Sequence, residues 1–379
     1  MKNSALYVHI PFCDHKCIYC DFYSIITSDN INPFLSSVKK EIEFYASLYS
    51  HGRFFSSIFF GGGTPSLMQP EYIGEIIKFL HKHYTVNDDS EITLETNPGT
   101  VDKRKLGLFL QEGINRISIG IQSFDNDDLK FLTRIHDKKT AVNTIFNARE
   151  AGFENINIDL IFNLPGQTKE KWLKNLQKAV KLPVKHISAY SLILERGTIL
   201  NKLVLDKKVT LQDDDYDAEL YQITMDFLES EGFIQYEVSN FAKPGFECRH
   251  NKAYWKYTDY LSFGTSAHSF ADGKRWWNFS SLKKYIDEIE KTGTAVAGFE
   301  IINEEQKFNE YIMLALRSSG IDLKDLESVH KEPGKECINE KNDYLKILMK
   351  QNLLKIDDKQ ISLTKNGYAV CDEILSKIL

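Results

Sequence analysis

Short apolar runs alternate with longer amphipathic stretches along the first half of the chain. Runs such as ISIGI and INIDLIF are almost continuously apolar, which is typical of strands that are covered on both faces. The pattern predicts strands at residues 6–10, 57–60, 91–95, 116–121, 156–162 and 186–192. Between them it predicts helices at residues 34–49, 72–84, 103–112, 140–151 and 170–180.

The strand-then-helix order repeats along this half, which predicts an α/β fold with a parallel sheet. We expect the sheet to curl into a partial (β/α)6 barrel. In such folds the chemistry lies where strands end and loops begin. Here those ends carry polar residues, glycine and proline, in the words HIPFC, FGGGTP, LETNP, GIQSF and IFNLPGQT. We expect them to meet at one mouth.

The pattern changes after about residue 230. Residues 231–300 are dense in aromatic residues, histidine and glycine, and we interpret them as an extension of the barrel formed by residues 1–230. In residues 301–379 the pattern predicts two helices, a hairpin and a last helix, the first three at 309–318, 341–351 and 353–364. This order resembles a winged helix. The helix that would contact nucleic acid in a winged helix, residues 343–351, is not notably basic. We therefore expect a structural or substrate-covering role and no nucleic-acid binding.

Composition narrows the class of protein. The 379 residues are 42% hydrophobic and carry a formal net charge of −6, which argues against a protein held on nucleic acid by backbone electrostatics. No apolar run reaches the roughly 18 residues of a transmembrane helix, and a signal peptide at the N-terminus would remove the first cysteines. The other cysteines are scattered. We expect a reducing, cytoplasmic compartment, with peripheral membrane association only through a partner.

Three of the six cysteines lie within eight residues, in the stretch CDHKCIYCDF. Cys13, Cys17 and Cys20 have the spacing C-x3-C-x2-C. Three thiolates do not fill a tetrahedral zinc site, but His15, inside the motif, could complete it. A [4Fe–4S] cluster can instead be held at three irons by cysteine, which leaves one iron open for another ligand. The motif therefore predicts a metal centre, with zinc as the alternative to the cluster.

This cysteine motif, with Tyr19 before its last cysteine and GGGTP at residues 61–65, resembles that of radical S-adenosylmethionine (SAM) enzymes. The resemblance implies that SAM binds the open iron. It also implies that an electron from the cluster cleaves SAM to methionine and a 5′-deoxyadenosyl radical. The glycines would let the backbone approach the methionyl group closely.

The sequences at the strand ends resemble those of the radical SAM branch that contains oxygen-independent coproporphyrinogen III oxidase. The resemblance covers nearly the whole chain. The resemblance implies that Tyr7 lies beside the cluster and that Gly62 and Glu95 hold the cluster-bound SAM. Further positions match those that hold a second SAM in the oxidase: Tyr19, Gly63, Thr64, Gln122, Arg134 and Asp159. The alternatives are a solvated loop acid for Glu95 and structural hydrogen bonding for Gln122 and Arg134.

Two features depart from the oxidase. Phe22 stands where the oxidase motif continues to a further cysteine, and only twelve residues precede Cys13, where we expect a longer segment in the oxidase. Both features resemble the HemW-type haem chaperones instead. The stretch HNKAYW, residues 250–255, matches the H-N-x-x-Y-W motif of that group.

The HNKAYW motif implies a haem site. His250 offers a neutral imidazole, a common axial ligand of haem iron, and Tyr254 and Trp255 offer flat apolar surface. The alternative for His250 is a hydrogen-bonded packing residue. Cys248 and His268 are weaker candidates for haem ligation, and Cys248 is also readable as an inert buried thiol.

The resemblance implies a haem chaperone that delivers haem to acceptor haemoproteins, with respiratory proteins as one such class. It implies a [4Fe–4S] cluster and SAM, one molecule or two, and an electron donor if SAM is cleaved. The alternatives are an oxygen-independent coproporphyrinogen III oxidase and a zinc-stabilised binding module. The sequence leaves open whether the chain is an enzyme.

Overall fold

The computed structural model describes residues 1–27, 29–328 and 343–379. Its central feature is a run of parallel strands, each paired with the next along the chain. They are β1 (Lys2–Ile10), β2 (Arg53–Gly62), β3 (Val86–Thr96), β4 (Arg116–Gln122), β5 (Asn155–Phe162) and β6 (His186–Ser191). The predicted strands are all confirmed, although β1, β2 and β3 begin earlier than the pattern indicates.

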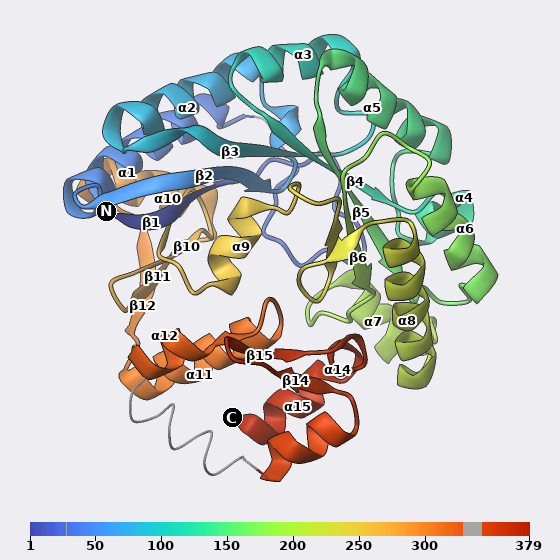
Figure 1. The fold of residues 1–379 in the computed structure, drawn as a ribbon. Helices are drawn as coiled ribbons and strands as arrows, with labels where there is room; N and C mark the ends of the chain where they lie inside the picture. Colours follow the sequence, from blue (N-terminus) through green and yellow to red (C-terminus); the bar gives the residue numbers. More distant parts are fainter. Residues whose placement is uncertain (28, 329–342) are drawn as a thin grey trace.

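Helices connect these strands and cover the outer side of the curved sheet (Figure 1). The predicted helices are confirmed as α1 (Ile31–Tyr49), α2 (Pro70–His83), α3 (Lys103–Gln111), α5 (Lys138–Ala151) and α6 (Lys169–Ala179). Side chains cap several of them, because Asp102, Asp137 and Thr168 each accept a hydrogen bond from a backbone N–H in the first turn. Other helices went unpredicted: η1 (Pro65–Leu67), α4 (Asn126–Phe131), α7 (Ile199–Leu205) and α8 (Asp214–Ser230).

The strands form because one face of each is apolar and covered by helices. Ile117, Ile119 and Ile121 of β4 are fully buried, as are Ile156 and Ile158 of β5. The residues that alternate with them are mostly polar or small and face the inner side of the curve. Within the described ranges, none of the helices is both long and apolar enough to cross a membrane.

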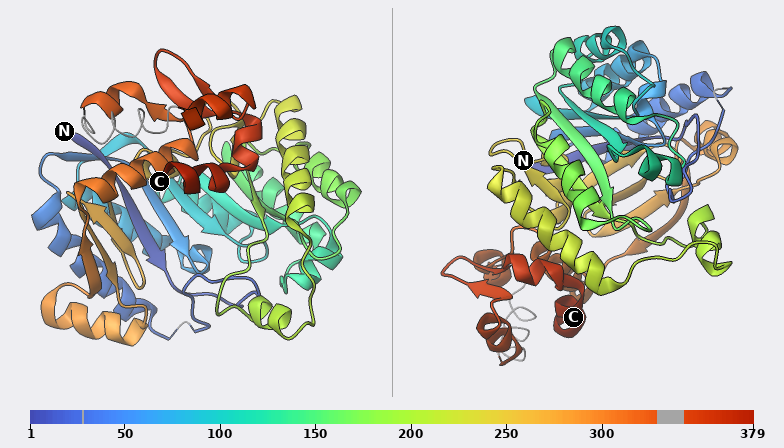
Figure 2. Two further views of the ribbon diagram at one scale, coloured as in Figure 1. Left: turned by 90° about the horizontal axis from the view of Figure 1, so that it is seen from below. Right: turned by 90° about the vertical axis from the view of Figure 1, so that its right-hand side faces the viewer.

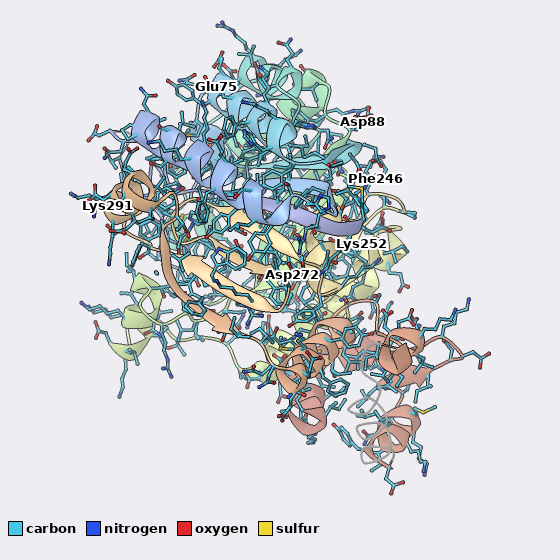
Figure 3. The ribbon with its side chains drawn as sticks, turned by 90° about the vertical axis from the view of Figure 1, so that its left-hand side faces the viewer. Glu75, Asp88, Phe246, Lys252, Asp272 and Lys291 are labelled. Carbon is cyan, nitrogen blue, oxygen red and sulfur yellow. The ribbon has the colours of Figure 1, made fainter. Side chains whose placement is uncertain are left out.

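Residues 231–300 extend both edges of the same sheet, whose order is β12-β11-β10-β9-β1-β2-β3-β4-β5-β6-β8-β7. Next to β1 lie β9 (Tyr260–Phe263), which is parallel to it, and then β10 (His268–Ala271), β11 (Lys274–Asn278) and β12 (Val296–Ile301). The other edge carries β8 (Asn240–Ala242) and β7 (Ile234–Gln235). Figure 3 shows the β1 side, with Asp272 in the turn between β10 and β11.

Two helices of this region pack on the barrel. α10 (Leu282–Thr292) lies against α1, and Figure 3 labels Lys291 near its end. α9 (Arg249–Trp255) lies on the inner side of the curved sheet, where it contacts β1 and β2 (Figure 1). The HNKAYW stretch is therefore helical and faces the interior of the partial barrel.

The C-terminal residues form a unit with its own hydrophobic core, which projects from the main body (Figure 2). Its elements are α11 (Glu304–Leu316), β13 (Ile321–Asp322), α12 (Leu323–Ser328), β14 (Leu354–Ile356), β15 (Gln360–Leu363), α14 (Lys365–Ala369) and α15 (Cys371–Ile378). The predicted hairpin is confirmed as β14 and β15, and β13 adds to it on the β15 side. Of the helix predicted at 341–351, residues 343–350 are helical, whereas 341 and 342 lie outside the described residues.

Candidate functional site

A cavity of about 430 Å³ opens at the carboxyl ends of the parallel strands, on the inner side of the curve. Most of the residues that the sequence singles out line it. They are Cys13, Cys17, Tyr19, Cys20, Gly62, Gly63, Thr64, Glu95, Gln122, Arg134 and Asp159. Two others, Tyr7 and His250, lie behind its wall. The strand ends therefore converge as expected, although the first and the last of them, those of β1 and β6, are more than a hundred residues apart in the chain.

The cysteine loop runs across the mouth of this cavity. The backbone N–H of Cys13 donates to the carbonyl of Ile25 at 2.9 Å, which ties the two ends of the loop together. The carbonyl of Ile18 accepts from the N–H of Leu200 at 2.9 Å, so the start of α7 supports the middle of the loop. In the metal-free protein, burial raises the pKa of the Cys20 thiol to about 11. Metal binding would have to displace that proton.

A chain of hydrogen bonds links the first two cysteines across the cavity. The Cys13 Sγ lies 3.2 Å from the Thr64 hydroxyl, which accepts from the Asn97 amide at 2.9 Å. The Asn97 Oδ1 accepts from Arg134 at 2.6 Å, and the same guanidinium reaches the Cys17 Sγ at 3.5 Å. Arg134 also donates to the Gly120 carbonyl at 2.8 Å. These contacts hold two of the three thiols in position before any metal binds.

Two glycines at the end of β2 are required by the local geometry. Gly62 has a φ of +111°, and a Cβ there would lie 2.7 Å from the ring of His9. A Cβ on Gly63 would lie 2.6 Å from the carbonyl oxygen of Phe12, just before the first cysteine. The backbone after β2 thus packs directly against the cysteine loop. Gln122 ends β4 at a φ of 68°, a conformation that non-glycine residues adopt rarely and often at functional sites.

Two carboxyl groups lie in the cavity wall. The Glu95 Oε2 accepts from the N–H of Gly62 at 3.2 Å. Burial, and then the nearby Asp159, raise the pKa of Glu95 to about 8. Burial also raises the pKa of Asp159, whose oxygens accept from Asn157 at 2.8 Å and from Ser118 at 3.3 Å. Two such groups favour a cationic ligand, because a positive charge would stabilise their ionised forms.

The donor set fits the cofactors that the cysteine motif implies. Three thiols face one cavity, glycine backbone lines it beside them, and a carboxylate lies next to that backbone. Among the described residues, no three His, Cys, Asp or Glu side chains lie close enough together to bind a single metal ion. The ring of His15, the proposed fourth ligand of a zinc site, lies 3.3 Å from the Thr133 hydroxyl.

His250 is buried in α9 rather than exposed to the cavity. Its Nδ1 lies 3.0 Å from the Ser57 hydroxyl, and its Nε2 lies 3.2 Å from the Tyr254 hydroxyl. The ring stacks on Phe59 at 5.0 Å between centroids and on Tyr7 at 6.2 Å. Burial, with the Arg116 charge, lowers the pKa of His250 to about 3, so its imidazole is neutral.

The two weaker haem candidates differ in their surroundings. Cys248 is fully buried, its Sγ donates to the Glu91 carboxylate at 3.3 Å, and burial raises the pKa of its thiol to about 12. His268 is exposed and stacks on Trp277 at 5.8 Å. Neither lines the cavity.

Sequence reasoning overlooked several cavity residues: Phe59, Asn97, Arg116, Ser118, Asn157, Ser188, Tyr190 and Asn251. A signal for some of them was present. Because side chains alternate along a strand, Ser118 shares a face with Gln122, and Asn157 shares one with Asp159. Asn97 stands in the LETNP word itself. Asn251 stands in the HNKAYW motif, but its place in the cavity could not be foreseen, because α9 enters the cavity from a distant part of the chain.

Comparisons with known proteins agree with this geometry. The model of the radical SAM superfamily matches residues 7–179. The chain is 33% identical to "Heme chaperone HemW" of Bacillus subtilis (strain 168), over 100% of this chain and 99% of the relative. The chain belongs to the HemW family of radical SAM proteins. It is also 34% identical to "Radical S-adenosyl methionine domain-containing protein 1, mitochondrial" of Danio rerio, over 100% of this chain and 87% of that protein.

A solved structure shares the fold of this HemW-family chain throughout. Coproporphyrinogen III oxidase (HemN) from Escherichia coli matches with a TM-score of 0.84 and 25% identity, over 100% of this chain and 90% of that one. The expected partial radical SAM barrel is therefore confirmed. Membership of the superfamily implies a [4Fe–4S] cluster and SAM as cofactors, which favours the cluster over the zinc alternative.

Proposed function

We propose that the protein binds haem and delivers it to acceptor haemoproteins, and that it carries a [4Fe–4S] cluster and SAM. The observation that carries the proposal is the match over essentially the whole chain to proteins named as haem chaperones. Phe22 supports it as well, since this cavity residue stands where the oxidase motif has a further cysteine.

Cys13, Cys17 and Cys20 would hold the cluster, which would supply the electron if SAM is cleaved. Beside them Gly62 leaves room for the methionyl group, and Glu95 offers a carboxylate to its ammonium. Tyr7 would support this end of the cavity from behind, next to Gly61. The residues proposed for a second SAM are Tyr19, Gly63, Thr64, Gln122, Arg134 and Asp159.

We assign the haem site to α9, with His250 as the axial ligand. Its imidazole is neutral, which is the form that binds iron. Both ring nitrogens have partners, so ligation through Nε2 requires the Tyr254 hydroxyl to move away from the 3.2 Å contact. Haem binding is therefore proposed to be coupled to a local rearrangement of α9, and Tyr254 and Trp255 would supply the surface against the porphyrin.

Haem transfer is the direct test. The reconstituted protein is loaded with haem and mixed with an apo-haemoprotein, and the Soret band of the acceptor is followed. The same sample, with reductant and SAM, is assayed for coproporphyrinogen III conversion. We expect transfer without conversion. Conversion without transfer would replace the proposal with the oxidase, which the fold of HemN favours as the second candidate and which needs an electron donor.

The ligand assignment has its own test. His250→Ala should weaken haem binding at least tenfold and change the Soret maximum, because the axial nitrogen is lost. His51→Ala is the matched control, since this histidine is exposed in the turn between α1 and β2 and is no candidate for haem ligation. An unchanged titration for His250→Ala would show that haem binds elsewhere.

A further inference from the structure

A buried row of hydrogen bonds leads from the cavity wall to α9. The Asn157 Nδ2 donates to the Asp159 Oδ1 at 2.8 Å. The Oδ1 of Asn157 lies 2.6 Å from the His186 Nδ1. The His186 Nε2 lies 2.8 Å from the Tyr236 hydroxyl. That hydroxyl accepts from the backbone N–H of Cys248 at 3.3 Å. Asp159 and Asn157 line the cavity, whereas the other three lie outside it.

Every donor in this row points the same way. Burial keeps the pKa of His186 well below its usual range, so its ring is neutral and has one N–H. Because the Asn157 Oδ1 can only accept, that N–H is on Nδ1, and Nε2 accepts from Tyr236. Each bond therefore donates toward Asp159. Bonds aligned in this way polarise one another, so a change in the charge of the Asp159 carboxylate alters the strength of every bond in the row.

The far end of the row is the first turn of α9. The Cys248 Sγ caps this helix by accepting from the N–H of Asn251 at 3.5 Å. A second contact holds the same turn, because the Glu91 carboxylate accepts from the N–H groups of Arg249 and His250 at 3.1 and 3.2 Å.

Glu91, which makes the second contact with α9, also lies close to a residue of the cavity wall. Glu91 is 3.9 Å from Arg116, a 2% exposed residue that lines the cavity and whose Nε has no hydrogen-bond partner in the part of the chain that the structure describes. The turn that carries His250 is thus attached to the cavity wall at two points.

We propose that Tyr236 and His186 are positioning residues that link occupancy of the cavity beside Asp159 to the position of α9. SAM and haem binding are then thermodynamically coupled, each changing the affinity for the other by the same factor. This inference rests on the proposed function. Its structural half, the response of α9 to SAM, needs only SAM in the cavity beside Asp159, and its coupling half also needs haem on α9.

Hydrogen exchange tests the structural half on the reconstituted full chain. Adding SAM should slow amide exchange in Arg249–Trp255 several-fold in the wild type. Tyr236→Phe, which removes only the bridging hydroxyl, should lose most of that response. Tyr221→Phe is the matched control, because its hydroxyl also joins two groups, Gln235 and Val238, but lies outside the row. No SAM response in the wild type, or an undiminished one in Tyr236→Phe, would overturn the inference.

Haem titrations with and without saturating SAM test the coupling. We expect the two dissociation constants of the wild type to differ at least fivefold, and those of Tyr236→Phe to differ less than twofold. Saturable haem binding that ignores SAM would overturn the coupling while leaving the proposed function standing. An absence of haem binding in the wild type would refute the proposed function, and the exchange result would still decide the role of Tyr236.

Discussion

At the scale of single residues, two acidic side chains are buried together in the cavity, where we expect a cationic ligand. Glu95 and Asp159 face the same space, and burial raises the pKa of each. The folded protein without ligand therefore tolerates these acids at a cost in stability. A bound ammonium or sulfonium group would relieve that cost, so stability and ligand binding oppose each other here.

Glu95→Gln should stabilise the ligand-free protein at pH 8 and weaken SAM binding. The folded state holds the Glu95 proton more tightly than the unfolded chain, so wild-type stability falls as pH rises from about 4.5 to about 8. The neutral amide of the variant does not titrate and carries no such loss, so the gain at pH 8 is roughly 2 to 4 kcal/mol. Denaturant unfolding at pH 5 and pH 8 measures it.

The control for this change is Glu150→Gln, an exposed acid paired with Lys103 on the outer helices. It should alter stability by less than about 0.5 kcal/mol at either pH. A Glu95→Gln gain of equal size at pH 5 and pH 8 would contradict the titration argument.

Asn97→Ala should reduce SAM affinity of the reconstituted protein about five- to tenfold, or roughly 1 to 1.4 kcal/mol. The amide bridges Thr64 and Arg134, so its loss frees both groups that position the thiols. Calorimetric titration checks the affinity. Asn126→Ala removes an exposed amide that accepts from the Lys138 N–H and lies outside the cavity lining, and it should leave the titration unchanged. Equal affinities for the two variants would remove Asn97 from the site.

At the scale of elements, one buried acid fastens α1 to the extension of the sheet. Glu41 accepts hydrogen bonds from the Gly264 N–H at 2.9 Å, from Asn278 at 2.6 Å and from the Tyr285 hydroxyl at 2.7 Å. Its partners come from the β9–β10 loop, from β11 and from α10. A single side chain thus connects four segments on the β1 side of the barrel.

Glu41→Ala should lower the free energy of unfolding by about 3 kcal/mol, because three buried donors lose their acceptor. Glu43→Ala provides the comparison, since it is two residues away on the same helix and exposed. It should change stability by less than about 0.5 kcal/mol. Denaturant unfolding of both variants tests the difference, and similar values would mean that water replaces the lost carboxylate.

The sequence predicts the repeating elements well and the edges of the sheet poorly. The core strands alternate fully buried isoleucines with small or polar residues, as in ISIGI, and this alternation leaves a local signal. β7 and β8 have two and three residues, and they form only because β6 offers an edge. The contact of α9 with the cavity is equally invisible locally, since it depends on pairing between distant segments.

The cavity was predictable only in part, because some of its residues stand in local sequence motifs and others are brought together only by folding. Residues in recognisable words, such as Gly62 and Glu95, could be assigned before the fold was known. Arg116 could not be ranked, because its role comes from a partner that is brought near only by folding. Asn97 stands in the same LETNP sequence as Glu95, but only folding shows its bond to Arg134. The burial of His250 was likewise out of reach, since four aromatic or polar side chains from β1, β2 and α9 surround it.

At the scale of the whole molecule, an ion-pair group joins the C-terminal unit to the sheet. Arg275 on β11 binds both oxygens of Glu310 on α11, at 3.0 and 2.6 Å, and the Tyr257 hydroxyl donates to the same carboxylate at 2.7 Å. The backbone N–H of Val238 also donates to the carbonyl of Arg317 at 3.0 Å. These contacts attach the unit at the middle of α11, through Glu310, and at its C-terminal end, through Arg317.

Arg275→Met should loosen this attachment, since it leaves Glu310 without its bidentate partner. We expect amide exchange in α11 to become several-fold faster and overall stability to fall by about 1 to 2 kcal/mol. Lys307→Met removes an exposed pair within α11 and should change neither quantity appreciably. Unchanged exchange in Arg275→Met would show that the backbone contact and apolar packing suffice.

The parallel pairing of β9 with β1 has a consequence for biosynthesis. β1 is made first, but its second neighbour spans Tyr260–Phe263, about 250 residues later. At roughly 5 to 20 residues per second, ribosomes need on the order of 10 to 50 seconds to cover that interval. During this interval Cys13, Cys17 and Cys20 follow β1 in the chain while the second neighbour of β1, β9, has not yet been made. We therefore expect the proposed cluster to be loaded after β9 has been synthesised and has completed the pairing of β1.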